Sequence, residues 1–391
     1  MTKKTDTPAI RFKGFSDTWE QRKLTEFVEF FSGLTYTPND VQENGTLVLR
    51  SSNVSNGEVV DADNVYVNPQ VVNSENVKGG DIVVVVRNGS RSLIGKHAQI
   101  KAFMPNTVIG AFMTGIRSEC PEFTNALLNT SRFEEEIAMN MGATINQITG
   151  YMFSKMEFKV PCLDEQKKIG EYFEKLDNLI TLHQREYEKL HNIKKSMLEK
   201  MFPKNGSNVP EIRFKGFTEA WEQRKVREIT DRYDNLRIPV AASLRIAGTT
   251  PYYGANGIQD YVEGYTHDGE FILVAEDGAN DLKNYPVKCV KGRIWVNNHA
   301  HVLQGKCACA DNQFLAYAIS QADIESLLVG GGRAKLNAET LMDIELLLPS
   351  KDEQIQIGSY LARLDNLITL HQRELEKLQN IKKSMLEKMF V

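Results

Sequence analysis

The sequence predicts an α+β fold in which two mixed α/β domains are separated by two long helices. The helices are expected to pack as an antiparallel coiled coil, duplicated about a pseudo-two-fold axis. Two observations predict this fold: two blocks of sequence occur twice, and the stretches between them are unlike each other but share short apolar runs bounded by Gly and Asn turns. At roughly 150 residues per domain, 391 residues suit two to three domains.

The first copied block covers residues 11–23, with the segments Arg-Phe-Lys-Gly-Phe and Trp-Glu-Gln-Arg-Lys, and it returns at 213–225. The second covers 164–202 and recurs at 352–390, with 31 of 39 aligned positions identical. No comparable similarity joins the stretches between the blocks. Two unlike domains are therefore set into two nearly identical frames.

Each long copied block is predicted to be a helix. Asp164 and Glu165, like Asp352 and Glu353, place carboxylates in the first turn, where they face the positive end of the helix dipole. Thirty-nine residues at 1.5 Å each give a rod of about 58 Å, whose apolar stripe needs a partner. The obvious partner is its own copy. The stripe recurs at three and four spacing in both copies: Ile169, Tyr172, Leu176, Leu179, Leu190, Ile193 and Met197, then Ile357, Tyr360, Leu364, Leu367, Leu378, Ile381 and Met385.

The segment between the first helix and the second domain sets the expected helix direction. Residues 203–212 reach at most about 33 Å, too short to run back along the rod, so an antiparallel pair with the domains at opposite ends is expected. The predicted boundaries are 1–160 for the first domain, 161–202 for the first helix, 203–212 for the linker, 213–350 for the second domain and 351–391 for the second helix.

The two unlike domains are predicted to carry polar loops over short strands. Strands are expected at 45–50, 81–87, 271–275 and 293–296, and helices at 131–141 and 312–328. Arg pairs bidentately with guanine and Asn with adenine, so loops of Asn, Ser, Arg and Tyr suit the reading of DNA bases, although such residues are also ordinary in turns. The predicted DNA-binding residues are Arg50, Ser52, Asn53, Arg87, Asn88, Arg91, Tyr253, Asn256, Asn280, Asn297, Asn298, Arg333 and Lys335.

The charge balance argues against a nucleic-acid binder that works alone. The net charge is −4, and both 28–160 and 230–350 hold more acidic than basic residues. A protein that binds nucleic acid by itself usually has a basic excess. Any DNA contact must therefore come from a small local cluster, with partners supplying further positive charge.

Catalytic motifs are scarce. The sequence lacks GxGxxG, Walker-type, GxSxG and HExxH patterns. His299, His301, Cys307 and Cys309 could be imagined as zinc ligands, but their spacing differs from common zinc modules. Asp268, Glu270 and Lys283 only loosely resemble a nuclease cluster. We therefore expect a chain without catalytic residues, metal or cofactor of its own.

The duplicated frames resemble the specificity subunit of type I restriction–modification enzymes. The resemblance runs from about residue 10 to 391 and is most specific in the two copied blocks. It implies that each domain is a target-recognition domain for one half of a bipartite, asymmetric DNA site. It also implies that the helices set the spacer and dock two methyltransferase subunits. Those partners are expected to use S-adenosylmethionine for adenine-N6 methylation, and restriction subunits bound through them to use ATP and Mg²⁺.

Two other classes of protein are compatible with parts of this pattern. A duplicated coiled-coil adaptor that binds proteins and no DNA would share the frame, and a metal-dependent nuclease would cut DNA alone. The longest apolar runs fall far short of the roughly 20 residues that cross a bilayer, and five scattered cysteines suit reduced thiols. A cytoplasmic protein without membrane contact is therefore expected.

Overall fold

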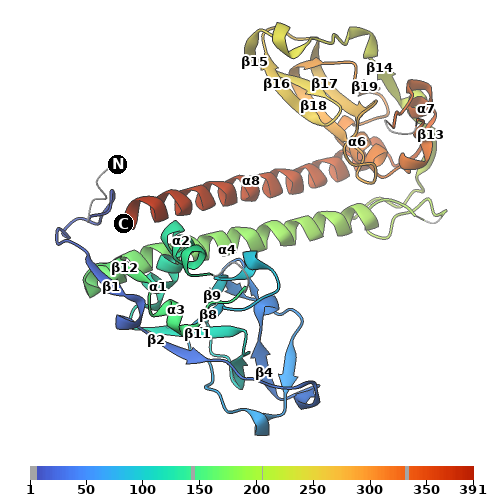
Figure 1. Cartoon of the computed structure of the whole chain (residues 1–391). Helices are drawn as coiled ribbons and strands as arrows, with labels where there is room; N and C mark the ends of the chain where they lie inside the picture. The colour runs from blue at the N-terminus through green and yellow to red at the C-terminus, as the bar shows by residue number, and fades with distance from the viewer. Residues whose placement is uncertain (1–6, 142–145, 205, 331–333) are drawn as a thin grey trace. The chain divides into compact units, whose positions relative to one another are not determined.

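The computed structural model describes residues 7–141, 146–204, 206–330 and 334–391 (Figure 1). The chain forms two compact units: the first comprises 1–183 with 373–391, and the second comprises 184–372. The two long helices are α4, Leu163–Lys200, and α8, Lys351–Met389, so each begins in one unit and ends in the other. Both helices begin and end within two residues of their predicted bounds.

The first unit holds two four-stranded sheets. One has the order β2-β11-β8-β9 and is antiparallel throughout, and the other has the order β10-β4-β7-β3, with β10 parallel to β4. The predicted strands at 45–50 and 81–87 are β4 and β8. The strands of these sheets, with the small hairpin β5–β6, are β2 (Val28–Ser32), β3 (Val41–Gln42), β4 (Thr46–Leu49), β5 (Val54–Ser55), β6 (Glu58–Val59), β7 (Val65–Val67), β8 (Ile82–Val85), β9 (His97–Gln99), β10 (Thr107–Ile109) and β11 (Met113–Ser118).

The second unit is built on one six-stranded sheet of order β14-β19-β17-β18-β15-β16. The pair β15–β18 is parallel, and the other neighbours are antiparallel. The predicted strands at 271–275 and 293–296 are the apolar ends of two longer strands. The strands are β14 (Thr230–Arg232), β15 (Ala247–Gly254), β16 (Gly257–Val262), β17 (His267–Ala275), β18 (Val287–Val296) and β19 (Ala300–Gly305).

Short helices cover the sheets. The first unit has α1 (Pro121–Leu128), α2 (Ser131–Asn140) and α3 (Gly150–Phe153), and the second has α5 (Val226–Ile229), α6 (Asn312–Ser320) and α7 (Ala338–Asp343). The prediction at 131–141 is confirmed by α2. The helix predicted at 312–328 ends at Ser320, because the Asp323 side chain accepts the Ser326 N–H and a separate 3-10 turn forms at Glu325–Leu327.

The copied residues make the same frame in both units. In the first, strand β1 (Glu20–Lys23) pairs with β12 (Glu157–Val160), and in the second β13 (Glu222–Lys225) pairs with β20 (Glu345–Leu348). The Arg11 guanidinium donates two hydrogen bonds of 2.7 and 2.8 Å to the Glu165 carboxylate, and Arg213 donates two of 2.7 Å to Glu353. The first copied block is thereby clamped to the first turn of the long helix.

Just beyond the end of each long helix, a phenylalanine packs against the core of the unit that the helix enters. Phe390 stacks on Phe123 at 5.6 Å and meets Trp19 edge-on, while Phe202 stacks on Phe314 at 5.5 Å and meets Trp221 edge-on. In the first unit Phe173 packs on Phe390, and one turn later Asp177 pairs with Lys382 at 2.6 Å; Asp365 pairs with Lys194 at 2.5 Å in the second. Partner numbers fall as residue numbers rise, so the helices are antiparallel, as predicted.

The segment around Ile10 lies against the end of α8 in the first unit. The Ile10 N–H donates to the Lys388 carbonyl at 2.9 Å, which reproduces the 2.9 Å bond from Ile212 to Lys200 in the second unit. Ile10 therefore occupies in the first frame the place that Ile212 occupies in the second.

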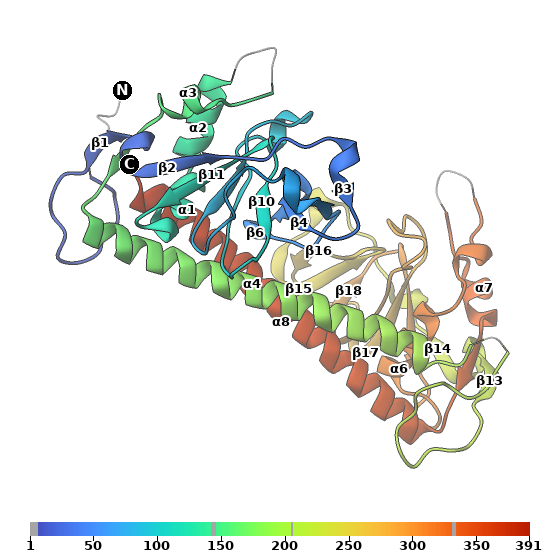
Figure 2. The same cartoon turned by 90° about the horizontal axis from the view of Figure 1, so that it is seen from below.

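The middle of the predicted helix stripe differs from expectation. Leu179 and Leu367 are each 43% exposed rather than buried in a seam. The apolar stripe is interrupted directly after these leucines, where polar residues follow: His183 and Glu186 in one copy, His371 and Glu374 in the other. Among the described residues, the buried side chains of the two helices lie near the helix ends, against the domain cores. Figure 2 shows the course of both helices from below.

A glycine in each long helix allows the adjoining domain to approach closely. A Cβ at Gly170 would lie 2.7 Å from the Phe123 nitrogen, and one at Gly358 would lie 2.8 Å from the Phe314 nitrogen. Alanine normally favours a helix by about 1 kcal/mol over glycine, but overpacking against backbone costs about 1–3 kcal/mol. Gly170→Ala and Gly358→Ala should therefore destabilise the protein in urea unfolding, whereas Glu171→Ala, on the exposed neighbouring position, should not. A stabilised Gly170→Ala would contradict this packing.

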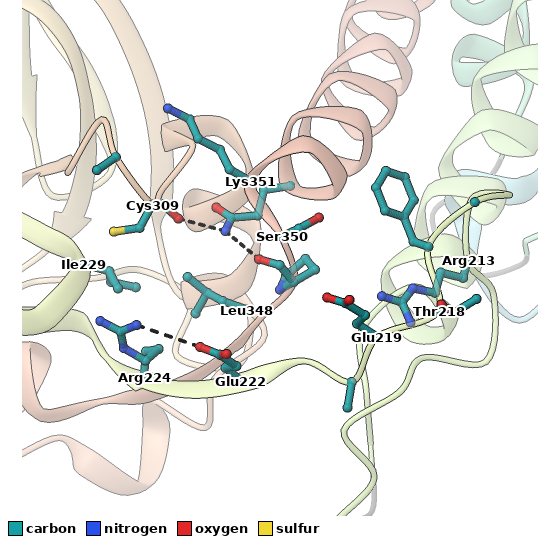
Figure 3. Close-up of a pocket in the computed structure, with 16 residues that line it drawn as sticks. Arg213, Thr218, Glu219, Glu222, Arg224, Ile229, Cys309, Leu348, Ser350 and Lys351 are labelled. Atoms are coloured by element: carbon teal, nitrogen blue, oxygen red, sulfur yellow. Dashed lines mark hydrogen bonds and ion pairs between the residues drawn. The ribbon is translucent and has the colours of Figure 1, made fainter.

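A pocket lies at the start of α8, between the frame strands and the helix (Figure 3). Arg224 and Glu222 of β13 line it, together with Ser350 and Lys351. An equivalent pocket at the start of α4 contains Arg22 and Glu20. Both pockets belong to the duplicated frame. In the described part of the chain, no helix is long and apolar enough to cross a membrane.

Candidate nucleic-acid interface

The first unit brings four polar segments together at one edge, called loop cluster 1. They are the 3-10 turn Ser51–Asn53, the loop 87–91, the turn at Phe112, and residues 146–147. The Asn88 amide donates to Ser51 Oγ at 3.1 Å, and the Val86 N–H donates to the Phe112 carbonyl at 2.9 Å. Arg87 and Gln147 form a backbone bridge. The chain thus gathers residues almost 100 positions apart.

The exposed side chains of loop cluster 1 include three predicted ones. Ser52, Arg87 and Arg91 face solvent, and the Arg87 guanidinium lies over the ring of Phe112 at 5.0 Å. Phe112 is itself 55% exposed. A cationic guanidinium over an exposed ring offers both charge and a stacking surface.

Other predicted residues of the first unit have structural roles. Asn53 is fully buried; its Oδ1 accepts from the Arg50 N–H, and its amide donates to the Ala62 carbonyl. The prediction that it reads a base is therefore wrong, because no polar atom of it faces outward. Asn88 uses both ends of its amide within the cluster, and the Arg50 guanidinium bonds the backbone and carboxylate of Asp63.

The second unit gathers an equivalent loop cluster 2. It consists of the β15–β16 turn at Asn256, the segments 276–280 and 297–299, and Lys335. The Asn256 amide donates to the Gly278 carbonyl at 2.9 Å, and its Oδ1 accepts the Asn280 N–H at 2.9 Å. Asp277 and Lys335 form a backbone bridge at the place where Arg87 and Gln147 form one in the first unit.

Two predicted base readers of the second unit are buried. Tyr253 is 7% exposed in the core, where burial raises the pKa of its phenol, and Asn297 is 4% exposed with its Oδ1 accepting the His299 N–H at 2.8 Å. Both predictions are wrong, since these side chains are buried: Tyr253 packs in an apolar core, and Asn297 holds the backbone of its own loop. Asn280 and Asn298 are exposed, and Asn256 is exposed but binds the neighbouring loop. Arg333 lies outside the described residues.

Lys335 belongs to a charge network under loop cluster 2. Its Nζ lies 2.9 Å from Glu276, whose carboxylate also accepts from Arg237 at 2.7 Å. Burial opposes ionisation of Glu276, but the Arg237 and Lys335 contacts hold the pKa of its carboxyl below the ordinary value. His301 lies beside it, with Nδ1 at 2.7 Å from Asp234 and Nε2 at 2.9 Å from the Leu336 carbonyl.

Sequence reasoning missed several residues of both clusters. Phe112 follows Gly110 between two apolar runs, which is a turn signal that could have found it. Asn146 and Gln147 follow no recognisable strand, and only the fold brings them beside Arg87. Asp277, Glu276 and Arg237 carry no motif.

The comparison with protein families decides what this duplicated arrangement is. The model described as type I restriction modification DNA specificity domain matches residues 16–192 and again 218–380. The chain belongs to this family. The two matches coincide with the two frames, so the predicted resemblance is confirmed, and the matched domain is one of DNA specificity rather than catalysis.

Curated relatives and a solved structure that this chain resembles are also specificity subunits. A type I restriction enzyme specificity subunit of Haemophilus influenzae is 43% identical over 146 residues, covering 37% of this chain and 38% of the relative. One of Methanocaldococcus jannaschii is 23% identical over 275 residues, covering 63% and 64%. These alignments span about two fifths and two thirds of the relatives. The crystal structure of an M. genitalium S subunit has a TM-score of 0.74 at 15% identity, covering 98% and 99%, which shows the same fold.

In this specificity-family chain, the residues once considered for zinc do not converge. The His299 ring contacts Asp277, while His301 is buried against Asp234, and Cys307 is exposed. Among the described residues, no group of three or more His, Cys, Asp or Glu side chains could hold a metal. The residues considered for a nuclease have other partners: Asp268 pairs with Arg293 at 3.2 Å, and Glu270 faces Asn312.

Proposed function

We propose that the chain is the DNA sequence-specificity subunit of a type I restriction–modification complex. Each domain reads one half of a bipartite, asymmetric site through its loop cluster. Partner subunits supply adenine-N6 methylation and restriction, together with the S-adenosylmethionine, ATP and Mg²⁺ that those reactions need. The chain itself contributes recognition and needs no cofactor.

One observation carries this proposal. The two frames make the same contacts, and the loop clusters occupy the same place on them, yet the side chains there differ. The Ile148 N–H donates to Val86 and the Leu336 N–H to Glu276, both at 2.8 Å, but Arg87 and Gln147 stand where the second unit has Asp277 and Lys335. An identical scaffold with unlike reading surfaces is what two different half-sites require.

The recognition step is tested by removing exposed arginines. Methylation sequencing first identifies the DNA motif. On a duplex that contains this motif, Arg87→Ala and Arg91→Ala should each weaken binding by about 1–3 kcal/mol, and each should relax the base preference at positions of one half-site only. The measurement is titration of cognate and scrambled duplex with the assembled methyltransferase. Lys13→Ala, which removes an exposed charge from the frame, is the matched control. Parent-like binding by both arginine variants would reject loop cluster 1, and absence of duplex binding by the parent would favour the adaptor.

We further propose that the long helices set the spacer between the half-sites and dock two methyltransferase subunits. Each helix carries a copied pair of exposed leucines: Leu179 and Leu182 are 43% and 55% exposed, and Leu367 and Leu370 are 43% and 54% exposed. Two identical apolar pairs on the frame, outside the unlike domains, suit two identical partners.

Charged substitutions on one helix should therefore remove one partner. Burying a leucine contributes about 1.5–3 kcal/mol, so Leu182→Lys should weaken one docking event at least tenfold, and Leu182→Lys with Leu370→Lys should weaken both. The mass of the complex in light scattering would fall from two bound methyltransferases to one and then to none. Leu244→Lys, at a 73% exposed leucine of the second domain, should leave two bound. Unchanged mass in the double variant would place the docking surface elsewhere.

A further inference from the structure

His301 differs from the other buried histidines in the kind of partners that its ring meets. His97 accepts at one nitrogen from the Asn129 amide and donates at the other to the Gly95 carbonyl, so a neutral ring satisfies both. His267 likewise meets the Thr266 hydroxyl and the Tyr233 carbonyl. The ring of His301, 1% exposed, meets two oxygens that can only accept, Asp234 Oδ2 and the Leu336 carbonyl.

Asp234 cannot be the donor in this pair. Burial opposes its ionisation, but hydrogen bonds from His301 and the Val302 N–H, with Arg237 nearby, hold the pKa of its carboxyl below the ordinary value. Its Oδ1 accepts the Val302 N–H at 2.8 Å. Both nitrogens of His301 therefore face oxygens that accept, an arrangement that a ring with a proton on each nitrogen would satisfy.

Two carboxylates lie at the centre of this network, and more than two cationic side chains contact them. Its two carboxylates are Asp234 and Glu276, 12% and 15% exposed, and its internal cations are Arg237 and His301. Arg232 approaches Asp234 at 3.8 Å but also pairs with the exposed Glu339. With His301 charged, the internal cations already match the two carboxylates.

Lys335 is thereby left as the surplus cation. It is the most exposed member, at 45%, and its backbone is fixed by hydrogen bonds in both directions with Val329. The Lys335 side chain can move away from Glu276 without leaving this carboxylate unpaired, because Arg237 and His301 Nδ1 still lie 2.7 and 3.7 Å from the Glu276 carboxylate.

We propose that His301 is held as an imidazolium and that its charge releases Lys335 from Glu276 to bind a DNA phosphate. His301 is then a positioning residue of the second domain, acting through Lys335. This inference rests on the proposed function and adds the residue that determines whether the phosphate contact can form.

The charge of the ring can be read directly. In the full chain labelled with ¹⁵N-histidine, at pH 7, the His301 signal should show two protonated ring nitrogens, while His97 and His267 show one each. A neutral His301 ring would overturn the proposal. This measurement uses the parent protein and needs no variant beyond one for assignment.

The effect of His301 on the DNA contact of Lys335 is tested in the assembled methyltransferase. The probe is a duplex that contains the motif identified by methylation sequencing. Each phosphate contact contributes about 0.9 to the salt slope of binding, so Lys335→Ala should lower the slope by about that amount in the parent. In a His301→Gln background, Lys335→Ala should leave the salt slope almost unchanged, because Lys335 then stays paired with Glu276 and makes no phosphate contact. His267→Gln is the control: in this background, Lys335→Ala should lower the salt slope by as much as it does in the parent.

Equal decrements in the parent and His301→Gln backgrounds would overturn the inference while leaving the proposed function intact. Failure of the parent complex to bind the duplex would instead remove the proposed function. If His301→Gln does not fold, the ring signals of the parent still decide the charge.

Discussion

Replacing Arg11 by alanine should destabilise the first unit by about 3–5 kcal/mol, and replacing Arg213 should do the same to the second. Each arginine makes two hydrogen bonds to one carboxylate that is 0% exposed, Glu165 or Glu353. Removing one partner of a buried pair leaves an uncompensated charge, which costs far more than the pair itself contributes. Hydrogen exchange followed by mass spectrometry would report the loss unit by unit.

The controls separate charge from geometry. Arg11→Lys retains the charge but cannot bond both carboxylate oxygens in the same plane, so its loss should be intermediate. Arg22→Ala removes a half-exposed arginine that lies 3.6 Å from Glu26 and should change stability by about 0.5 kcal/mol or less. A loss below about 1 kcal/mol in Arg11→Ala would mean that Glu165 finds water or another partner, and the clamp would not hold the frame.

The frame could be predicted from the sequence because its signals are local or repeated. First-turn carboxylates, the absence of proline and the apolar spacing define α4 and α8 within two residues of their ends. The duplication provides further information, because two nearly identical amphipathic helices in one chain are expected to pack against each other. Even so, the copied Arg11 and Glu165 gave no sign of their pairing, because nothing in a sequence relates residues 154 positions apart.

The side chains of the two loop clusters were less predictable, for a physical reason. Asn, Ser and Tyr near turns can be buried beneath a loop as well as exposed on its surface, since a buried amide can hold two backbone segments together. Asn53 and Asn297 do this, and the sequence does not distinguish them from exposed Asn280 and Asn298. Strand β17 was underestimated because its first residues, such as Asp268 and Glu270, are polar and partly exposed.

The dependence of each domain on its frame suggests how recognition can be exchanged. Replacement of residues 28–160 with the corresponding domain of a relative keeps β1 and both long helices, and re-forms the β1–β12 pair through backbone hydrogen bonds, which do not depend on side chains. The donor must also present a backbone that fits against Gly170 and an aromatic or apolar residue where Phe123 meets Phe390.

Such a chimera should methylate a site with one new half and one unchanged half. The reason is that loop cluster 1 lies wholly within the exchanged segment, whereas loop cluster 2 consists of Asn256, 276–280, 297–299 and Lys335, all in the second unit. Methylation sequencing of cells that carry the chimera and the methyltransferase gives the motif directly. The reciprocal exchange of 230–350 should change the other half, and Gly170→Ala within the first chimera should reduce its stability without altering the motif. Changes in both halves after a single exchange would show that the domains read the site jointly, since a reader confined to one unit has no means of altering what the other contacts.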